Sequence, residues 1–154
     1  MAFSPIPAFE ITLPINEGFR LIEASAGTGK TFTVGGIYLR LVIELNIPVQ
    51  KILVVTFTNA ATQELNTRLR DRLSAFESLL ENNVVAHSDP VFHHILTQTS
   101  VDNSREVLLE RVRRALVEFD EAKICTIHGF CQRLLSDQFF LAGEFVDFVL
   151  EPSD

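Results

Sequence analysis

The chain has 154 residues, a formal net charge of −7 and a hydrophobic fraction of 47%. This length suffices for one domain with a buried core, and the negative charge argues against a protein that coats nucleic acid through bulk electrostatics. No basic-then-apolar leader opens the sequence and no apolar run is long enough to span a membrane, so we expect a cytoplasmic protein. The two cysteines, Cys125 and Cys131, are too few for a disulfide framework and match no zinc spacing.

The first elements in chain order surround a glycine-rich segment. Residues 1–17 contain three prolines and are expected to form an extended N-terminal arm. Gly18–Glu23 predict a short strand, and the stretch from about Gly29 to Leu45 predicts a helix with a wide apolar stripe. Between them lies a candidate phosphate-binding loop that consists of Ala24, Ser25, Ala26, Gly27, Thr28, Gly29, Lys30 and Thr31.

A strand, a glycine-rich loop and a helix in this order are the context in which such a loop binds a nucleotide. Backbone N–H groups of the loop and of the helix N-terminus would hold the phosphates of ATP. Lys30 would reach the β- and γ-phosphates and the Thr31 hydroxyl would coordinate Mg²⁺, so these two residues are the catalytic candidates. Ala24 stands where the pattern usually has its first glycine, which narrows the backbone conformations available there.

The remaining elements are two further strands and four helices, and we expect a parallel sheet with helices on both faces. The apolar, β-branched run at residues 51–56 predicts a buried parallel strand. Further along the chain we expect a helix at 59–81, a short helical piece at 91–98, a helix at 104–119 capped by Asn103 or Ser104, a strand at 122–126 and a helix at 129–140.

Polar and aromatic residues follow both of these strands at their carboxyl ends, the edge at which open α/β sheets bind ligands. After the first come Thr56, Phe57, Thr58 and Asn59, and after the second come Thr126, Ile127, His128 and Gly129. Hydroxyls and backbone amides suit contacts with phosphate. The rings of Phe57 and Phe130 suit stacking on bases of a single strand.

Several of these residues also have a purely structural interpretation. Phe57 and Phe130 could belong to the core, His128 could be a hydrogen-bonding histidine, and Thr58 or Asn59 could cap the following helix. The set Arg68, Arg70 and Arg72 is interpreted as a solvated helix face. His87, His93 and His94 could bind a metal, although no cysteine or carboxylate stands at ligand spacing from them.

Three segments in order, residues 21–31, 54–65 and 126–133, resemble the N-terminal motor domain of UvrD-type superfamily-1 DNA helicases, and most closely its RecB-like group. The resemblance implies a P-loop NTPase (RecA-like) α/β fold, here an incomplete motor domain 1A over residues 18–140. It implies that Gly27, Gly29, Lys30 and Thr31 bind ATP and Mg²⁺. It also implies that Thr56–Asn59 and Thr126–Gly129 contact single-stranded DNA.

The resemblance further implies a role in recombinational repair. In the family, ATP hydrolysis closes two motor domains and drives the unwinding of duplex DNA ends. The full-length subunit also carries an exonuclease domain and works with RecC- and RecD-like partner subunits.

One requirement of phosphoryl transfer is not met by these residues. An ATPase needs an acidic pair after a hydrophobic strand, for Mg²⁺ and for the attacking water, whereas Asp120-Glu121 precedes its strand. We therefore expect the first piece of a longer helicase, with an acidic segment at residues 141–154 as a truncation edge. We expect it to bind nucleotide without efficient hydrolysis. The alternatives are a small P-loop nucleotide or metabolite kinase and a degenerate, non-enzymatic binding module.

Overall fold

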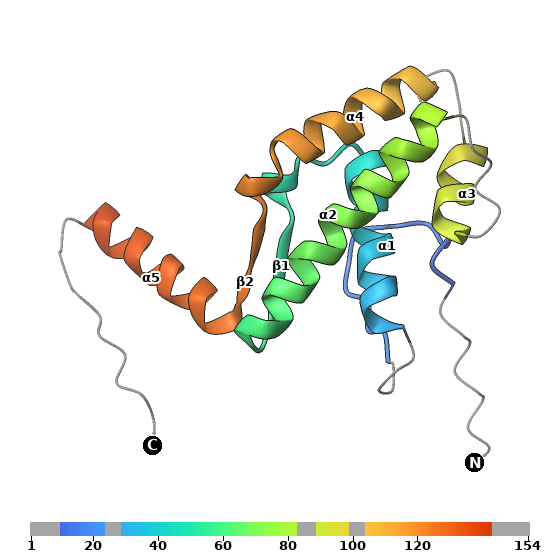
Figure 1. Cartoon of the computed structure of the whole chain (residues 1–154). Coiled ribbons are helices and arrows are strands. Elements are labelled where there is room, and N and C mark those ends of the chain that lie inside the picture. The colour runs from blue at the N-terminus through green and yellow to red at the C-terminus, as the bar shows by residue number, and fades with distance from the viewer. Residues whose placement is uncertain (1–9, 24–28, 83–88, 99–103, 143–154) are drawn as a thin grey trace, which may run out of the picture.

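The computed structural model describes residues 10–23, 29–82, 89–98 and 104–142, with side chains described as far as residue 137. This part of the chain contains two strands, β1 and β2, with helices before, between and after them (Figure 1). The elements are α1 (Lys30–Ile43), the 3-10 turn η1 (Val49–Lys51), β1 (Leu53–Thr56), α2 (Asn59–Asn82), α3 (Pro90–Thr97), α4 (Arg105–Val117), the 3-10 turn η3 (Phe119–Glu121), β2 (Lys123–Thr126) and α5 (Ile127–Ala142).

Every predicted helix is confirmed to within a few residues, as are the strands that became β1 and β2. Local chemistry sets the boundaries. Ser104 caps α4 by accepting a hydrogen bond from the Val107 N–H, as predicted. Helix α1 ends at Ile43, and Asn46 shortly after it has a left-handed backbone conformation with φ of 53°, which is typical of residues that follow the end of a helix.

The strand predicted at residues 18–23 is wrong for this structure, because these residues do not pair with any described strand. The side chains of Phe19 and Leu21 are therefore fully or almost fully exposed. A strand is stabilised by the neighbour with which it exchanges hydrogen bonds. In the described part of the chain, β1 and β2 pair only with each other.

The sheet consists of these two parallel strands, in a register that places Leu53 opposite Lys123 and Thr56 opposite Thr126. The segment that connects them contains α2, α3 and α4, as a parallel pair requires. Val54 and Ile124 pack against the helical core. Leu53 and Val55, on the other face, each remain 42% exposed, so the prediction of a buried strand holds for one face only. The physical reason is that α5 is the one described helix on that side, and it leaves much of the face open (Figure 1).

The core lies between α1, α2, α3 and α4 rather than at the sheet. Leu69, Leu73, Phe76 and Leu80 repeat at intervals of three and four along α2 and are all at most 1% exposed, and Leu65 at the start of this stripe is partly buried. Phe76 meets Phe92 of α3 edge to face, at 5.2 Å between ring centroids. Within the described residues, no helix combines the length and the apolar character that crossing a membrane requires.

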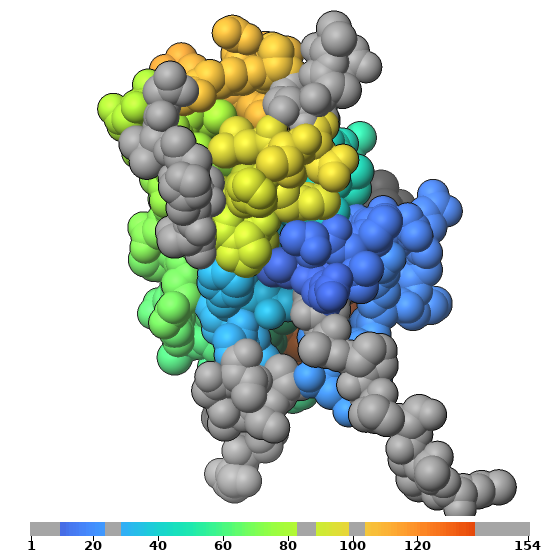
Figure 2. Space-filling model, turned by 90° about the vertical axis from the view of Figure 1, so that its right-hand side faces the viewer, coloured from blue at the N-terminus to red at the C-terminus, as the bar shows by residue number. Residues whose placement is uncertain are grey.

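A buried arginine fastens the N-terminal segment to α1. The Arg40 side chain is 2% exposed; it pairs with Glu44 and donates from Nη1 to the carbonyl oxygens of Ile11 and Leu13, both at 2.7 Å. Ile11 packs so closely on α1 that a Cβ at Gly36 would lie 2.3 Å from Ile11 Cδ1. Figure 2 shows the segment after residue 9 lying against α1 and α3. Residues 10–13 are thus part of the packed domain rather than of a free arm.

Replacing Arg40 should therefore destabilise the domain strongly. Arg40→Met removes the arginine that pairs with Glu44, whose carboxylate also lies 3.7 Å from His94 Nε2, and it removes the donor from two carbonyl groups. We therefore expect a loss of about 3 kcal/mol or more in the free energy of unfolding. Urea denaturation followed by circular dichroism measures it. Arg113→Met, which breaks exposed ion pairs with Glu77 and Glu81, is the control and should change stability little. Equal effects of the two substitutions would contradict the role of Arg40.

Candidate functional site

The first turn of α1 has the features expected of a phosphate-binding helix start. Gly29, the residue before the helix, has φ of 84°, a left-handed conformation that favours glycine. Its carbonyl oxygen accepts the first helical hydrogen bond, from the Thr33 N–H at 2.9 Å. The first turn contains no acidic residue, so the positive end of the helix dipole is not neutralised by one. Lys30 is exposed and Thr31 half-buried in this turn.

These described residues fit a Mg²⁺-nucleotide, since an ammonium group, a hydroxyl and backbone N–H groups occur together at a helix N-terminus. The rest of the predicted loop, Ala24, Ser25, Ala26, Gly27 and Thr28, lies outside the described residues. Their phosphate contacts stay predictions. Among the described residues, no group of three or more histidine, cysteine or acidic side chains could hold a metal ion by itself.

The carboxyl ends of the two strands lie at the same end of the molecule as the start of α1. Thr56 and Thr126 form the last register pair of the sheet, and α2 and α5 begin within a few residues of them. Figure 1 shows the first turns of α1, α2 and α5 together at this end. The structure thus brings Lys30 and Thr31 to the same edge as both groups of predicted DNA-contact residues.

Hydroxyl groups make the turn from β1 to α2 tight. The Thr58 hydroxyl accepts a hydrogen bond from the Ala61 N–H at 3.1 Å, which confirms that Thr58 caps α2. The Thr56 hydroxyl lies 2.6 Å from that of Thr62 and also donates to the Thr58 carbonyl. Phe57 is 81% exposed at the tip of this turn, so its core interpretation is wrong.

The turn from β2 to α5 uses the same chemistry. The Thr126 hydroxyl accepts a hydrogen bond from the Gly129 N–H at 3.1 Å and so caps α5. Ile127 and His128 are exposed beside it. Phe130 is half-buried and lines a cavity with Leu53 and Cys125 against the open sheet face. It therefore has a packing role, and of the two phenylalanines Phe57 alone presents a free ring to solvent.

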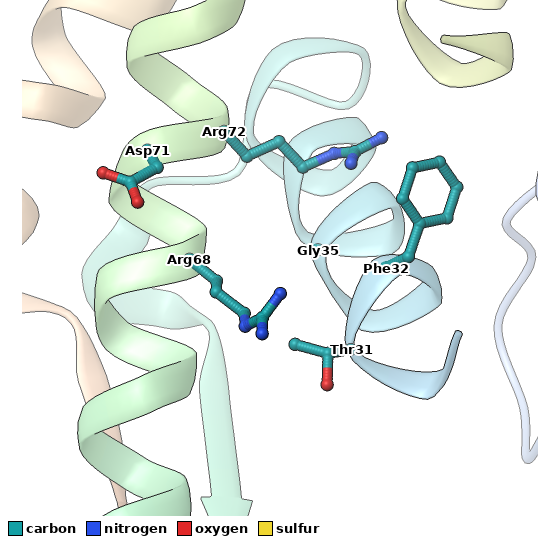
Figure 3. Close-up of a pocket in the computed structure, with 6 residues that line it drawn as sticks. All are labelled: Thr31, Phe32, Gly35, Arg68, Asp71 and Arg72. Atoms are coloured by element: carbon teal, nitrogen blue, oxygen red, sulfur yellow. The ribbon is translucent and has the colours of Figure 1, made fainter. Parts of the chain in front are cut away.

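A cavity of about 270 Å³ lies between α1 and α2, directly beside the first turn of α1. It is lined by Thr31, Phe32, Gly35, Arg68, Asp71 and Arg72. In Figure 3 the side chains of Arg68 and Arg72 extend from α2 toward α1, whereas Asp71 points away from it. Two guanidinium groups of α2 therefore face α1 across the cavity, and each also pairs with a carboxylate, Arg68 with Glu64 and Arg72 with Asp89.

The prediction of a solvated arginine face is confirmed for two residues and wrong for the third. Arg68 pairs with Glu64 and Arg70 with Asp120, and all four side chains are about half exposed or more. Arg72 is 13% exposed because it is packed between helices. Its position within the stripe formed by Leu69, Leu73 and Phe76 is the sequence signal that could have identified it.

The family of this chain follows from comparison with known proteins. Residues 9–151 match the UvrD/REP helicase N-terminal domain, and the chain belongs to this family. It is 38% identical to the RecBCD enzyme subunit RecB of Haemophilus influenzae over 147 residues. This aligned region covers 90% of this chain and 12% of that protein. The RecB of Escherichia coli is 38% identical over 86% of this chain and 11% of its own length. That of Mycolicibacterium smegmatis is 37% identical over 80% and 11%.

The chain is thus a RecB-like helicase N-terminal domain, and it spans about an eighth of the length of these relatives. The three segments on which the resemblance rested all fall within the matched region.

The capping role of Thr58 can be tested through the stability of the domain. Thr58→Ala removes the acceptor for the Ala61 N–H and should lower the free energy of unfolding by about 1 kcal/mol. Thr58→Ser retains a hydroxyl and should keep most of that stability. Thermal and urea unfolding of the two variants measure the difference, and an alanine variant as stable as the serine variant would contradict the cap.

Proposed function

We propose that this chain is the N-terminal ATP-binding part of a RecB-like, ATP-dependent DNA helicase and exonuclease subunit. The parent protein would act on single-stranded and duplex-end DNA in double-strand-break repair by homologous recombination, together with RecC- and RecD-like subunits. The observation that carries the proposal is that Gly29, Lys30 and Thr31, at the start of α1, lie at the same end of the molecule as the carboxyl ends of β1 and β2.

In this proposal, the residues divide into a nucleotide side and a DNA side. Ala24–Thr31 would hold ATP, with Lys30 at the β- and γ-phosphates and Thr31 as a ligand of Mg²⁺. The metal ion would supply charge neutralisation for the phosphates. Thr56–Asn59 and Thr126–Gly129 would lie along the DNA, with the exposed Phe57 ring stacking on a base.

We further propose that the chain by itself binds nucleotide without efficient hydrolysis. The described acidic residues that come shortly before β2 are Glu118, Asp120 and Glu121. Gln50 donates to Glu118 and Glu121, at 3.1 and 3.0 Å, and Arg70 pairs with Asp120. They precede β2 and therefore lie at the end of the sheet opposite Thr56 and Thr126. None of the three could place a carboxylate on Mg²⁺ at the start of α1.

The membership in the helicase family counts against the small kinase and the degenerate binding module. A kinase would also need an acceptor pocket beside the phosphate loop. The cavity beside Thr31 is instead lined by Phe32 and by two arginines, Arg68 and Arg72, that pair with carboxylates of this chain.

Nucleotide binding should depend on Lys30. We expect calorimetry with Mg²⁺ and a non-hydrolysable ATP analogue to give saturable binding that Lys30→Ala weakens by at least tenfold, because the substitution removes a charged contact with the phosphates. Lys51→Ala is the matched control, since Lys51 is an exposed lysine before β1, at the opposite end of the sheet. Folded wild-type protein that shows no binding, or binding equal to that of the Lys30→Ala variant, would overturn the assignment.

Single-stranded DNA binding should depend on Phe57. Phe57→Ala should weaken binding of a labelled oligo-dT roughly fivefold to a hundredfold, because one base loses its stacking partner. The unfolding midpoint should stay unchanged, since the ring is 81% exposed. Fluorescence anisotropy measures the affinity. The exposed Val117, on α4 at the far end of the molecule, offers Val117→Ala as a control. Loss of affinity in the control alone would contradict the predicted DNA track.

A further inference from the structure

Helix α2 connects the two sides of the proposed site. It begins at Asn59, directly after the Thr58 cap at the DNA side, and runs for 24 residues. Its middle packs against α1, which begins at the phosphate-binding residues. A helix is a stiff element, so a displacement of its first turn is carried to the contacts that it makes further along.

Arg72 of α2 is 13% exposed and contacts side chains of both α1 and α3. The centre of its guanidinium lies 4.4 Å from the ring centroid of Phe32 on α1 and 5.3 Å from that of Phe92 on α3. Nη2 donates to both carboxylate oxygens of Asp89, at 3.0 and 2.8 Å. Burial lowers the pKa of Arg72, and the nearby Asp89 carboxylate acts in the opposite direction.

The Asp89 carboxylate also holds α3 in place. It caps this helix by accepting hydrogen bonds from the N–H groups of Val91 and Phe92. Arg72 is therefore fixed from two sides, by a carboxylate that is itself anchored and by two aromatic rings.

The packing of α1 is shaped around this arginine. Phe32 directly follows Thr31, the proposed ligand of Mg²⁺, in the first turn of α1. One turn later, a Cβ at Gly35 would lie 3.2 Å from Arg72 Cδ, so the glycine leaves the room that the side chain uses. In Figure 3 the Arg72 side chain passes over Gly35 toward the Phe32 ring. The contact thus falls one residue from the phosphate-binding pair.

We propose that the stack of Arg72 on Phe32 is a positioning contact, through which α2 transmits the state of the DNA side to Lys30 and Thr31. The inference rests on the proposed function, because it requires that the edge bind both nucleotide and DNA. A nucleotide and single-stranded DNA then bind with mutual dependence, and each changes the affinity for the other by the same factor.

The test measures that factor in variants that leave the fold intact. The dissociation constant of a fluorescent, non-hydrolysable ATP analogue with Mg²⁺ is determined with and without saturating oligo-dT, below the unfolding transition of each variant. Phe32→Leu removes the ring but keeps the pair of Arg72 with Asp89. Arg72→Lys keeps the charge but not the planar face that stacks. Phe32→Tyr restores a ring, and Arg68→Lys changes another arginine that lines the same cavity.

We expect oligo-dT to change the nucleotide affinity of the wild-type chain by at least about fivefold. The same factor should persist in Phe32→Tyr and in Arg68→Lys, and should fall to about one in Phe32→Leu and Arg72→Lys while each ligand still binds. A factor of one in the wild type, or an undiminished factor in Phe32→Leu, would overturn the inference. Failure of the wild type to bind either ligand at all would instead remove the proposed function itself.

Discussion

Parallel pairing of β1 with β2, in which Thr56 lies opposite Thr126, brings two segments that are far apart in the sequence to one end of the molecule. Because the strands are parallel, the helices that follow them start at the same edge, and α1 starts there too. A slip of this register would separate the Thr58 and Thr126 caps and the exposed residues between strand and helix. The candidate site is therefore a consequence of strand pairing more than of any single side chain.

Two arginines, the buried Arg40 and the partly buried Arg72, then fix the helices relative to this edge. Arg40 fastens residues 10–13 to α1 through two carbonyl groups, and Arg72 joins α1, α2 and α3 through two rings and Asp89. Each is tied to a carboxylate, which is the condition under which a charge can be buried without a large loss of stability. The pairing of β1 with β2 determines where the candidate site lies. The ion pairs of Arg40 and Arg72 determine how the helices around the site are oriented.

Much of the fold could be predicted because its helices are strongly periodic and carry caps such as Ser104. The conformation of residues 18–23 could not be predicted, because their pattern favours a strand whereas no strand among the described residues pairs with them. Lys30, Thr31, Phe57 and the cap at Thr58 came from the local pattern alone. The role of Arg40 was missed, and Arg72 was wrongly assigned to a solvated helix face. A charged residue within an apolar stripe is interpreted as exposed until the side chains and carbonyl groups that it contacts are known.

The central claim is that one edge binds nucleotide at α1 and DNA at the starts of α2 and α5. Hydrogen–deuterium exchange with oligo-dT, and separately with a Mg²⁺-nucleotide analogue, tests it most directly. DNA should slow exchange at residues 57–62 and 127–131, and the analogue should slow it at residues 29–33, with α4 unaffected by both. Protection by DNA confined to α4, or no protection at the three helix starts, would contradict the account.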